Sequence, residues 1–241
     1  LANLQFFNQE TINPGVVPNA DDGTVDINWK LEEKSSDQLE LSAGWGGGVG
    51  LTGTLGVTFN NFSIRNIWKR SSWDPLPTGD GQKLSIRYQS NGRAYRSYSF
   101  SFTEPWLGGK KRNSLTIGIN NSKYSNAFDP YTGTIDRAKS DTNYLKTTGI
   151  SFALGKQLKW PDDYFSLVYS INLTQYKLRN YPIFDQNFKN GTSNNVSFKI
   201  ALQRSSVFNP IYPVSGSNFL ASVQFTPPYS LFNKNIANTN D

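Results

Sequence analysis

The stretch Gln38-Leu39-Glu40-Leu41-Ser42-Ala43-Gly44-Trp45 decides the fold class, because apolar and polar residues alternate along it with a period of two. Successive side chains of a β-strand point to opposite faces, so Leu39 and Leu41 share one face while Glu40 and Ser42 share the other. One apolar and one polar face is typical of a strand in the wall of a transmembrane β-barrel. A barrel satisfies its backbone hydrogen bonds without free edges, so it crosses lipid without a run of ~20 apolar residues.

The same alternation recurs as far as Phe225 and predicts an all-β fold, the N-terminal part of a transmembrane antiparallel β-barrel. Asn91-Gly92 is a strong signal for a tight hairpin within it. Nine strands are predicted, at 38–47, 50–60, 82–90, 93–103, 113–122, 146–156, 163–176, 195–204 and 217–226. Bacterial single-chain barrels have even strand numbers, so nine strands predict an incomplete wall; a complete eight-strand barrel with a misread ninth segment is the alternative.

The connections between these strands are predicted to differ in length on the two sides of the membrane. The long polar connections 123–145 and 177–194 fall on the same side, which we assign to the exterior because barrels carry their longer loops there. The connection 61–81 falls on the other side and is long for a periplasmic turn.

Residues 1–34 differ in character from the predicted wall. Val25, Ile27 and Trp29 alternate with polar residues and indicate one soluble-type strand with a partner before it, after a loop rich in Asn, Pro and Asp. This segment is too small to bury a core alone, so we expect it to be the end of a larger domain. The predicted organisation is therefore residues 1–34 as the end of a soluble domain and residues 35–241 as the barrel part.

The composition limits the chemistry. The 241 residues include 16 Phe, 12 Tyr and 6 Trp, but no Cys, Met or His. Without His and Cys the usual catalytic triads and zinc sites cannot form, so we expect neither an enzyme nor a bound metal or cofactor. The net charge is +6, but Lys and Arg are scattered rather than clustered, which argues against nucleic-acid binding. The absence of Met predicts a mature piece or a fragment of a longer chain.

Two motifs that could suggest chemistry fail on their context. Residues 48–53 match G-x-G-x-x-G, but an alternating strand follows instead of the helix that a dinucleotide site needs. Adjacent acids such as Asp162 and Asp163 sit in turns or point to opposite faces, so paired-carboxylate catalysis has no geometric support.

Five tryptophans lie near predicted strand ends or turns, which suits an aromatic girdle at the membrane interface. For Trp68 and Trp73, packing inside the connection 61–81 is the alternative. The basic run Lys110-Lys111-Arg112 predicts a solvated turn, with a lipid or partner contact as the alternative. The five are Trp45, Trp68, Trp73, Trp106 and Trp160.

Four segments together resemble the BamA family of outer-membrane barrel assembly proteins, also called POTRA-barrel or surface-antigen proteins. Their order and spacing carry the resemblance, which covers essentially the whole chain. The segments are residues 25–33, Gly44-Trp45-Gly46-Gly47-Gly48, Phe102-Thr103-Glu104-Pro105-Trp106-Leu107-Gly108 and Asn209-Pro210-Ile211-Tyr212-Pro213-Val214-Ser215-Gly216-Ser217. The long connection containing Phe62-Ser63-Ile64-Arg65-Asn66 and Pro77-Thr78-Gly79-Asp80-Gly81 is similar to the form seen in Bacteroidota relatives.

The resemblance implies a 16-strand barrel in the outer membrane of a Gram-negative cell, with residues 1–34 ending the last periplasmic POTRA domain. It implies a role as the central insertase of the barrel assembly machine, the BAM complex, which folds and inserts outer-membrane proteins. The implied partners are unfolded outer-membrane proteins, accessory lipoprotein subunits, outer-membrane lipids and lipopolysaccharide. A POTRA-barrel secretion transporter or an outer-membrane channel is the alternative.

The implied mechanism uses the first wall strand as a lateral gate whose free edge pairs with an incoming strand, since an open edge is a template for strand addition. Glycines should weaken ordered pairing at the end of this strand; a tight outer hairpin with a bulge is the alternative for them. The predicted pairing residues are Gln38, Leu39, Glu40, Leu41, Ser42, Ala43, Gly44 and Trp45, and the predicted flexible glycines are Gly46, Gly47, Gly48 and Gly50.

Overall fold

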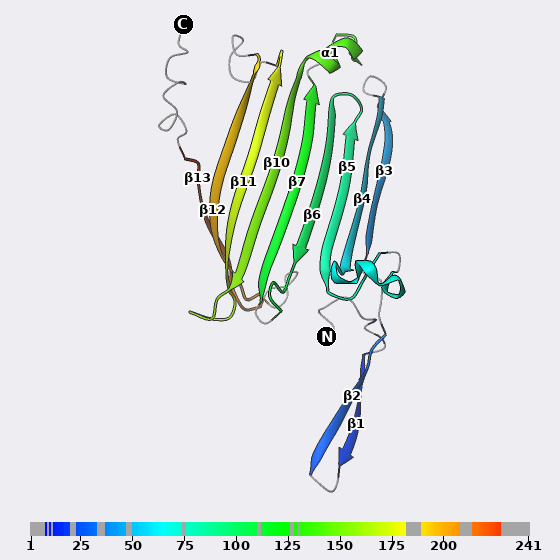
Figure 1. Cartoon of the computed structure of the whole chain (residues 1–241), viewed down its shortest axis with the longest axis vertical. Helices are drawn as coiled ribbons and strands as arrows, with labels where there is room; N and C mark the ends of the chain where they lie inside the picture. The colour runs from blue at the N-terminus through cyan, green and yellow to red at the C-terminus, as the bar shows by residue number, and fades with distance from the viewer. Residues whose placement is uncertain are drawn as a thin grey trace.

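The computed structural model is built almost entirely of antiparallel β-strands (Figure 1). One short α-helix, α1 (Arg137–Thr142), and two 3-10 helices, η3 (Arg65–Trp68) and η4 (Arg70–Ser72), lie in connections. The structure describes residues 8, 10, 12–19, 23–32, 37–46, 50–73, 76–109, 112–125, 128, 129, 131–181, 189–207 and 214–227.

All nine predicted wall strands are confirmed, with ends that differ from the prediction by up to four residues. They form one sheet in the order β13-β12-β11-β10-β7-β6-β5-β4-β3, so every strand pairs with its neighbour along the wall. The strands are β3 (Gln38–Gly46), β4 (Gly50–Phe62), β5 (Gln82–Asn91), β6 (Tyr95–Glu104), β7 (Asn113–Ser125), β10 (Tyr144–Gln157), β11 (Phe165–Arg179), β12 (Gly191–Ser205) and β13 (Asn218–Phe225).

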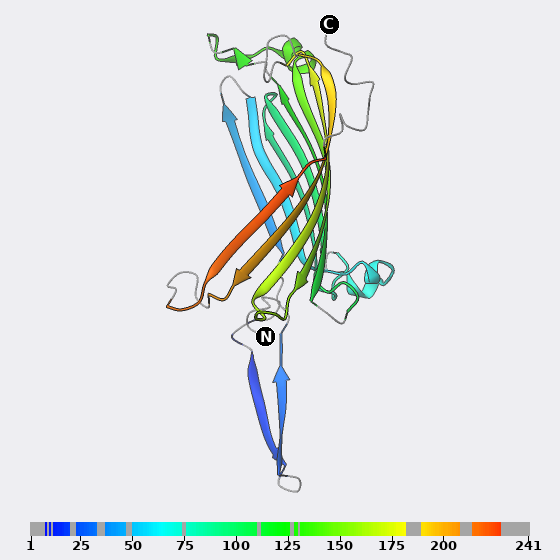
Figure 2. The same ribbon diagram turned by 90° about the vertical axis from the view of Figure 1, so that its left-hand side faces the viewer.

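The sheet is strongly curved, with one concave and one convex face (Figure 2). We call the end of the sheet nearest β1 (Asn13–Asn19) and β2 (Thr24–Lys30) the proximal rim; it carries the connections β4–β5, β6–β7, β10–β11 and β12–β13. The opposite end, the distal rim, carries the connections β3–β4, β5–β6, β7–β10 and β11–β12.

The strand register extends the alternation of each strand into rows that run across the sheet as far as β12. One row is entirely apolar, and the row beside it is polar or glycine. Directly paired residues lie on the same face of a sheet, so the two rows belong to opposite faces. The apolar row is Val57, Ile86, Phe100, Ile119, Ile150, Leu173 and Val196, and the polar row is Glu40, Gly56, Arg87, Ser99, Asn120, Gly149, Thr174 and Asn195.

The apolar face has no protein layer over most of its area. Among the described residues only two hydrophobic side chains, Phe62 and Leu178, are buried, whereas Leu39 and Leu41 are 69% and 71% exposed. Most of the exposed apolar side chains of the wall strands lie on this face, as a wall in contact with lipid requires, whereas Leu220, Tyr124 and Tyr176 are exposed on the polar face. In the part of the chain that the structure describes, no helix is long and apolar enough to cross a membrane.

Glycines on the polar face make room for side chains of neighbouring strands. A Cβ at Gly118 would lie 2.5 Å from the Ser151 hydroxyl, and a Cβ at Gly149 would overlap the Asn120 side chain. The polar side chains therefore lie down along the wall instead of projecting from it.

The N-terminal hairpin corrects one prediction. Residues 13–19, expected to lie in a loop, form β1 and pair with β2 from Asn13↔Lys30 to Asn19↔Thr24. Proline is tolerated on an edge strand because its missing N–H group can face away from the partner. The prolines at positions 14 and 18 therefore misled the loop prediction. The strand predicted around Val25–Trp29 is confirmed as β2, whereas residues 1–7 lie outside the described residues.

The β4–β5 connection is a folded unit held by polar side chains. Ser63 and Gln82 are 0% and 1% exposed. The Ser63 hydroxyl donates to Asp80 Oδ2 at 2.6 Å, the Ile64 amide donates to Gln82 Oε1 at 2.8 Å, and Gln82 Nε2 donates to Glu104 Oε2 at 2.6 Å. Gln82 and Glu104 belong to the apolar-side rows, so the connection packs on the convex face at the proximal rim (Figure 2).

The two tryptophans of this connection have different surroundings. Trp68 is 93% exposed, as an interfacial residue would be. Trp73 forms a bridge to Pro77, and its indole N–H donates to the Ile67 carbonyl at 3.2 Å, so it packs within the connection.

Candidate functional site at the β3 edge

Strand β3 is one edge of the sheet in the described part of the chain, where its partner is β4. The pairing runs from Gln38↔Thr58 to Gly46↔Gly50 and uses one side of the β3 backbone. The other side presents a row of N–H and C=O groups that another strand can pair with.

The structure places all eight predicted pairing residues, Gln38 to Trp45, on this strand. Leu39, Leu41 and Trp45 are 69%, 71% and 77% exposed on the apolar face. Gly46 ends the strand, and Gly50 begins β4 with a φ of 88°, a conformation that favours glycine. Gly47 and Gly48 lie outside the described residues, so their role stays a prediction.

An ion pair on the polar face ties β3 to the second strand along. Arg87 of β5 donates from Nε to Glu40 Oε2 and from Nη2 to Oε1, both at 3.0 Å. Between the two strands lies Gly56 of β4, where a Cβ would come within 3.3 Å of the Glu40 Cβ and 3.5 Å of the Arg87 Cγ. The absence of a side chain at this position lets the pair form across an intervening strand. We call Glu40, Gly56 and Arg87 the latch.

The latch was missed from the sequence. Arg87 and Glu40 are 47 positions apart, and only the register of three strands brings them into one row. A usable signal was present: each is a charged residue at a lumen-type position, and such positions need a partner when they face one another across a sheet.

A second contact supports the beginning of β3. The Asn60 amide donates to Asp37 Oδ1 at 3.2 Å, immediately before the strand. The proximal half of β3 is therefore held by Asp37 and by the latch, in addition to its backbone pairing.

The distal half of β3 has weaker side-chain support. Residues 42–46 carry no charge, and the Ser42 hydroxyl accepts the Thr54 amide at 3.0 Å. A shallow hollow of about 400 Å³ lies beside this half and is lined by small or polar residues that include Gly44, Thr52 and Gln89. Opening of the pairing should therefore begin at the distal end of β3.

Strand β13, the other edge, is anchored differently. Arg204 of β12 donates to Asp162 Oδ2 from Nε at 3.0 Å and from Nη2 at 2.9 Å. Its Nη1 donates to the Ser206 hydroxyl at 2.8 Å and to the Ser217 hydroxyl. At the other end of the pairing, the rings of Phe198 and Phe225 stack at 5.3 Å. Both ends of the β12–β13 pairing thus carry side-chain anchors.

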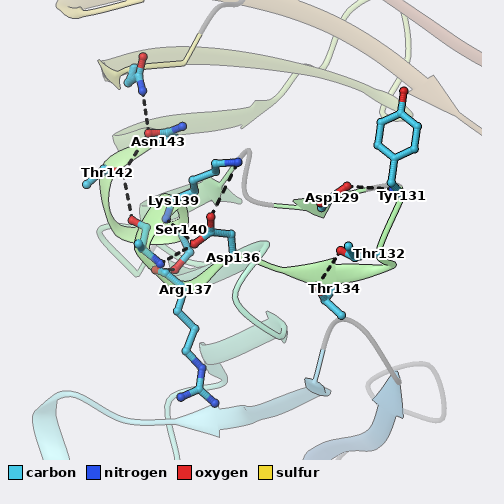
Figure 3. Close-up of polar contacts among 12 residues, drawn as sticks. Asp129, Tyr131, Thr132, Thr134, Asp136, Arg137, Lys139, Ser140, Thr142 and Asn143 are labelled. Atoms are coloured by element: carbon cyan, nitrogen blue, oxygen red, sulfur yellow. Dashed lines mark hydrogen bonds and ion pairs between the residues drawn. The ribbon is translucent and has the colours of Figure 1, made fainter.

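The β7–β10 connection forms a polar cap at the distal rim, leaning toward the concave side (Figures 2 and 3). It contains the hairpin β8 (Phe128–Asp129) with β9 (Thr134–Ile135), followed by α1. Asp136 caps α1 by accepting the Ala138 amide at 2.9 Å. Asp129 accepts the Tyr131 amide at 2.9 Å, and this hydrogen bond lowers the pKa of the Asp129 carboxyl below its ordinary value.

The chemistry available at the β3 edge is main-chain pairing. Among the described residues, no group of three His, Cys, Asp or Glu side chains is placed to hold a metal ion. The β3 edge presents a row of backbone donors and acceptors, an apolar face on the convex side and a polar face toward the concavity. An amphipathic β-strand has matching features.

A curved antiparallel sheet with an exposed apolar face and a polar concave face defines the wall of an outer-membrane-type β-barrel. The family model of the Omp85 superfamily domain matches residues 78–239, and the chain belongs to the Omp85 superfamily.

Two relatives are similar to this chain. It is 29% identical over 124 residues to the outer membrane protein assembly factor BamA of Neisseria meningitidis serogroup B, covering 52% of this chain and 12% of that protein. The crystal structure of BamA from Haemophilus ducreyi lacking POTRA domains 1–3 has a similar fold, with a TM-score of 0.55 and 22% identity over 94% of this chain. The chain spans 40% of that structure, so it corresponds to part of each relative. The predicted family and the predicted barrel fold are confirmed.

Proposed function

We propose that this chain is the gate-bearing part of an outer-membrane protein insertase, in which the free edge of β3 pairs with an incoming β-strand. The single observation that carries the proposal is the unequal anchoring of β3. Its proximal half is held by the latch and Asp37, while its distal half, residues 42–46, has one side-chain hydrogen bond and no charge.

Membership of the Omp85 superfamily and similarity to an outer membrane protein assembly factor support this role. By the same proposal, the protein resides in the outer membrane with residues 1–34 as the end of a POTRA domain in the periplasm. Its partners are unfolded outer-membrane proteins, accessory lipoprotein subunits, outer-membrane lipids and lipopolysaccharide. It acts without covalent chemistry, because strand exchange requires only the making and breaking of hydrogen bonds.

Site-specific crosslinking tests the proposal. Single cysteines at Leu39, Leu41 and Ala43 in the intact protein should form disulfides with cysteines in a stalled substrate strand, with yields that peak at one register. Cysteines at Phe219, Ala221 and Val223 of β13, on the same face of the sheet, are the matched controls on the other edge and should give lower yields. These 241 residues contain no cysteine, so once any cysteines elsewhere in the intact protein are replaced, every crosslink is assignable.

The result that would contradict the proposal is equally specific. Absence of substrate crosslinks at all three β3 positions, in a protein that still supports growth, would exclude β3 as the pairing edge. Secretion of a soluble passenger by the same protein would instead favour a transporter of the POTRA-barrel type.

A further inference from the structure

The proximal rim carries a basic and aromatic hollow that the gate does not use. It lies between the connection β6–β7 and the connection β10–β11 and has a volume of about 1010 Å³, at the upper end of the roughly 300–1,000 Å³ typical of small-molecule sites. Its lining includes three cations, two indole rings and one acid: Arg112, Lys156, Lys159, Trp106, Trp160 and Asp163.

The register places this hollow at the border of the lipid-facing surface. Lys156 pairs with Asn113 and Leu167, in the β10 series that includes Phe152 and Leu154 on the apolar face. Two residues further toward the rim, the chain turns at Leu158. The Lys156 ammonium is therefore the first charge met on leaving the apolar band of β10.

The cations of the hollow have few protein partners. Among the described residues, Arg112, Lys156 and Lys159 form no ion pair within 4.0 Å. Arg112 lies 5.9 Å from the centre of the Trp106 ring, and its Nη1 donates to Gln157 Oε1 at 3.4 Å. This geometry fixes the guanidinium at the hollow while leaving its other donors free for an anion.

The two tryptophans match a membrane-interface ligand rather than a soluble one. Trp160 is 81% exposed and Trp106 is 47% exposed, and indole rings favour the level of the lipid head groups. A site lined by cations and indoles at the border of an apolar wall is complementary to a phosphodiester carrying two acyl chains. Basic pockets at membrane borders bind anionic head groups in this way.

We infer that the hollow formed by Trp106, Arg112, Lys156, Lys159 and Trp160 binds the head group of an anionic phospholipid in the leaflet at the proximal rim. The inference rests on the proposed placement of the sheet in the outer membrane. The bound lipid would fix the height of the wall strands β7 and β10 in the bilayer, near the middle of the sheet rather than at the β3 edge.

Spin-labelled lipids test the inference on the intact protein reconstituted in phosphatidylcholine vesicles. The motionally restricted fraction of labelled phosphatidylglycerol, relative to that of labelled phosphatidylcholine, gives the selectivity. The native protein should prefer phosphatidylglycerol, and the triple variant R112Q/K156Q/K159Q should lose at least about fivefold of this preference, since each cation near a membrane surface contributes on that scale.

The matched control removes three charges elsewhere on the same rim. The variant R65Q/K69Q/R70Q changes the connection β4–β5, which lies outside the hollow, and should keep the native preference. An equal loss in both variants would mean general attraction to a basic rim and would overturn the site. Retained preference in R112Q/K156Q/K159Q would also overturn it. The single variant K159Q, at an exposed position, should show a smaller loss in the same direction and serves if the triple variant does not fold.

Two further measurements show which part of the inference is wrong if the experiment fails. Complete displacement of labelled phosphatidylglycerol by inorganic phosphate would identify a free-phosphate site and overturn the lipid assignment. A restricted fraction of labelled phosphatidylcholine reports lipid contact of the wall itself. Its absence would remove the membrane placement on which the inference rests, whereas its presence without selectivity would reject the hollow alone.

Discussion

The two edges of the sheet, β3 and β13, each pair with one neighbouring strand but differ in how side chains hold them. β13 carries no glycine, and both ends of its pairing are anchored, by the Arg204 cluster and by the Phe198–Phe225 stack. β3 contains glycines in its distal half, and its side-chain contacts are one exposed ion pair with Arg87 and the hydrogen bonds accepted by Asp37 and Ser42. The difference shows how a strand can be made openable at one end without weakening the whole sheet.

The largest expected effect comes from weakening β13, the more strongly anchored edge. Arg204→Gln removes the hydrogen bond to Ser217, which precedes β13, together with the ion pair to Asp162 that holds the guanidinium in place; the side chains of that pair are 24% and 35% exposed. We expect local opening of β13 to become easier by about 2 kcal/mol. Hydrogen exchange of residues 218–225, measured on the intact protein in detergent, checks this.

Arg96→Gln is the control for the loss of one arginine. Arg96 forms no ion pair among the described residues, so exchange of β13 should stay at the native rate in this variant. Unchanged β13 exchange in Arg204→Gln would mean that backbone pairing alone holds this edge.

The second effect comes from disrupting the latch at Gly56, its middle residue. Gly56→Val places a branched side chain against the Glu40 and Arg87 stems, and crowding of this kind costs about 1–2 kcal/mol. Exchange of residues 38–41 should accelerate. Gly56→Ala, which adds only the Cβ, should fall between Gly56→Val and the native protein, and the reverse order would refute the steric explanation.

The third effect concerns the ion pair itself and is smaller, because both side chains are about half exposed. Glu40→Gln should raise the exchange rate of β3 about threefold and raise the yield of substrate crosslinks at Leu41. The double variant E40R/R87E restores opposite charges across Gly56 and should return both values toward native. Failure of this reversal would show that the two residues act independently.

The smallest expected effect is a pH dependence of the β7–β10 connection that the two edge strands do not share. The pKa of Asp129 is lowered from its ordinary 3.8, so its contribution to the β8–β9 hairpin is complete above that pH and is lost as the pH falls through the lowered pKa. Asp129→Asn should remove this acid transition from the exchange profile of residues 131–134. If hydrogen exchange of β3 also becomes faster than that of β13 as the pH falls through this transition, the β7–β10 connection contributes to holding β3 in the sheet.

Much of the wall could be predicted because a period of two is a local signal. Leu39, Leu41 and Trp45 reveal their face within one strand, and the same holds for each of the other eight strands. The sequence shows Glu40 and Arg87 as charges at lumen-type positions, but their pairing could not be predicted, since it depends on the relative register of β3, β4 and β5. The polar network of Ser63, Asp80 and Gln82 was missed for a similar reason, because its partners become neighbours only after the connection folds over the convex face.

The polar, flattened concave face has a consequence for any polypeptide that enters the concavity. Glycines at positions such as 118 and 149 let hydroxyl and amide groups lie along the wall, so much of this surface presents polar groups to an entering segment. Among the described residues, Leu39 and Leu41 lie exposed on the β3 edge, whose distal half has a single side-chain hydrogen bond, at Ser42. We therefore expect an incoming apolar strand to bind weakly to the concave face and to pair at the β3 edge, where unpaired backbone groups and lipid are both available.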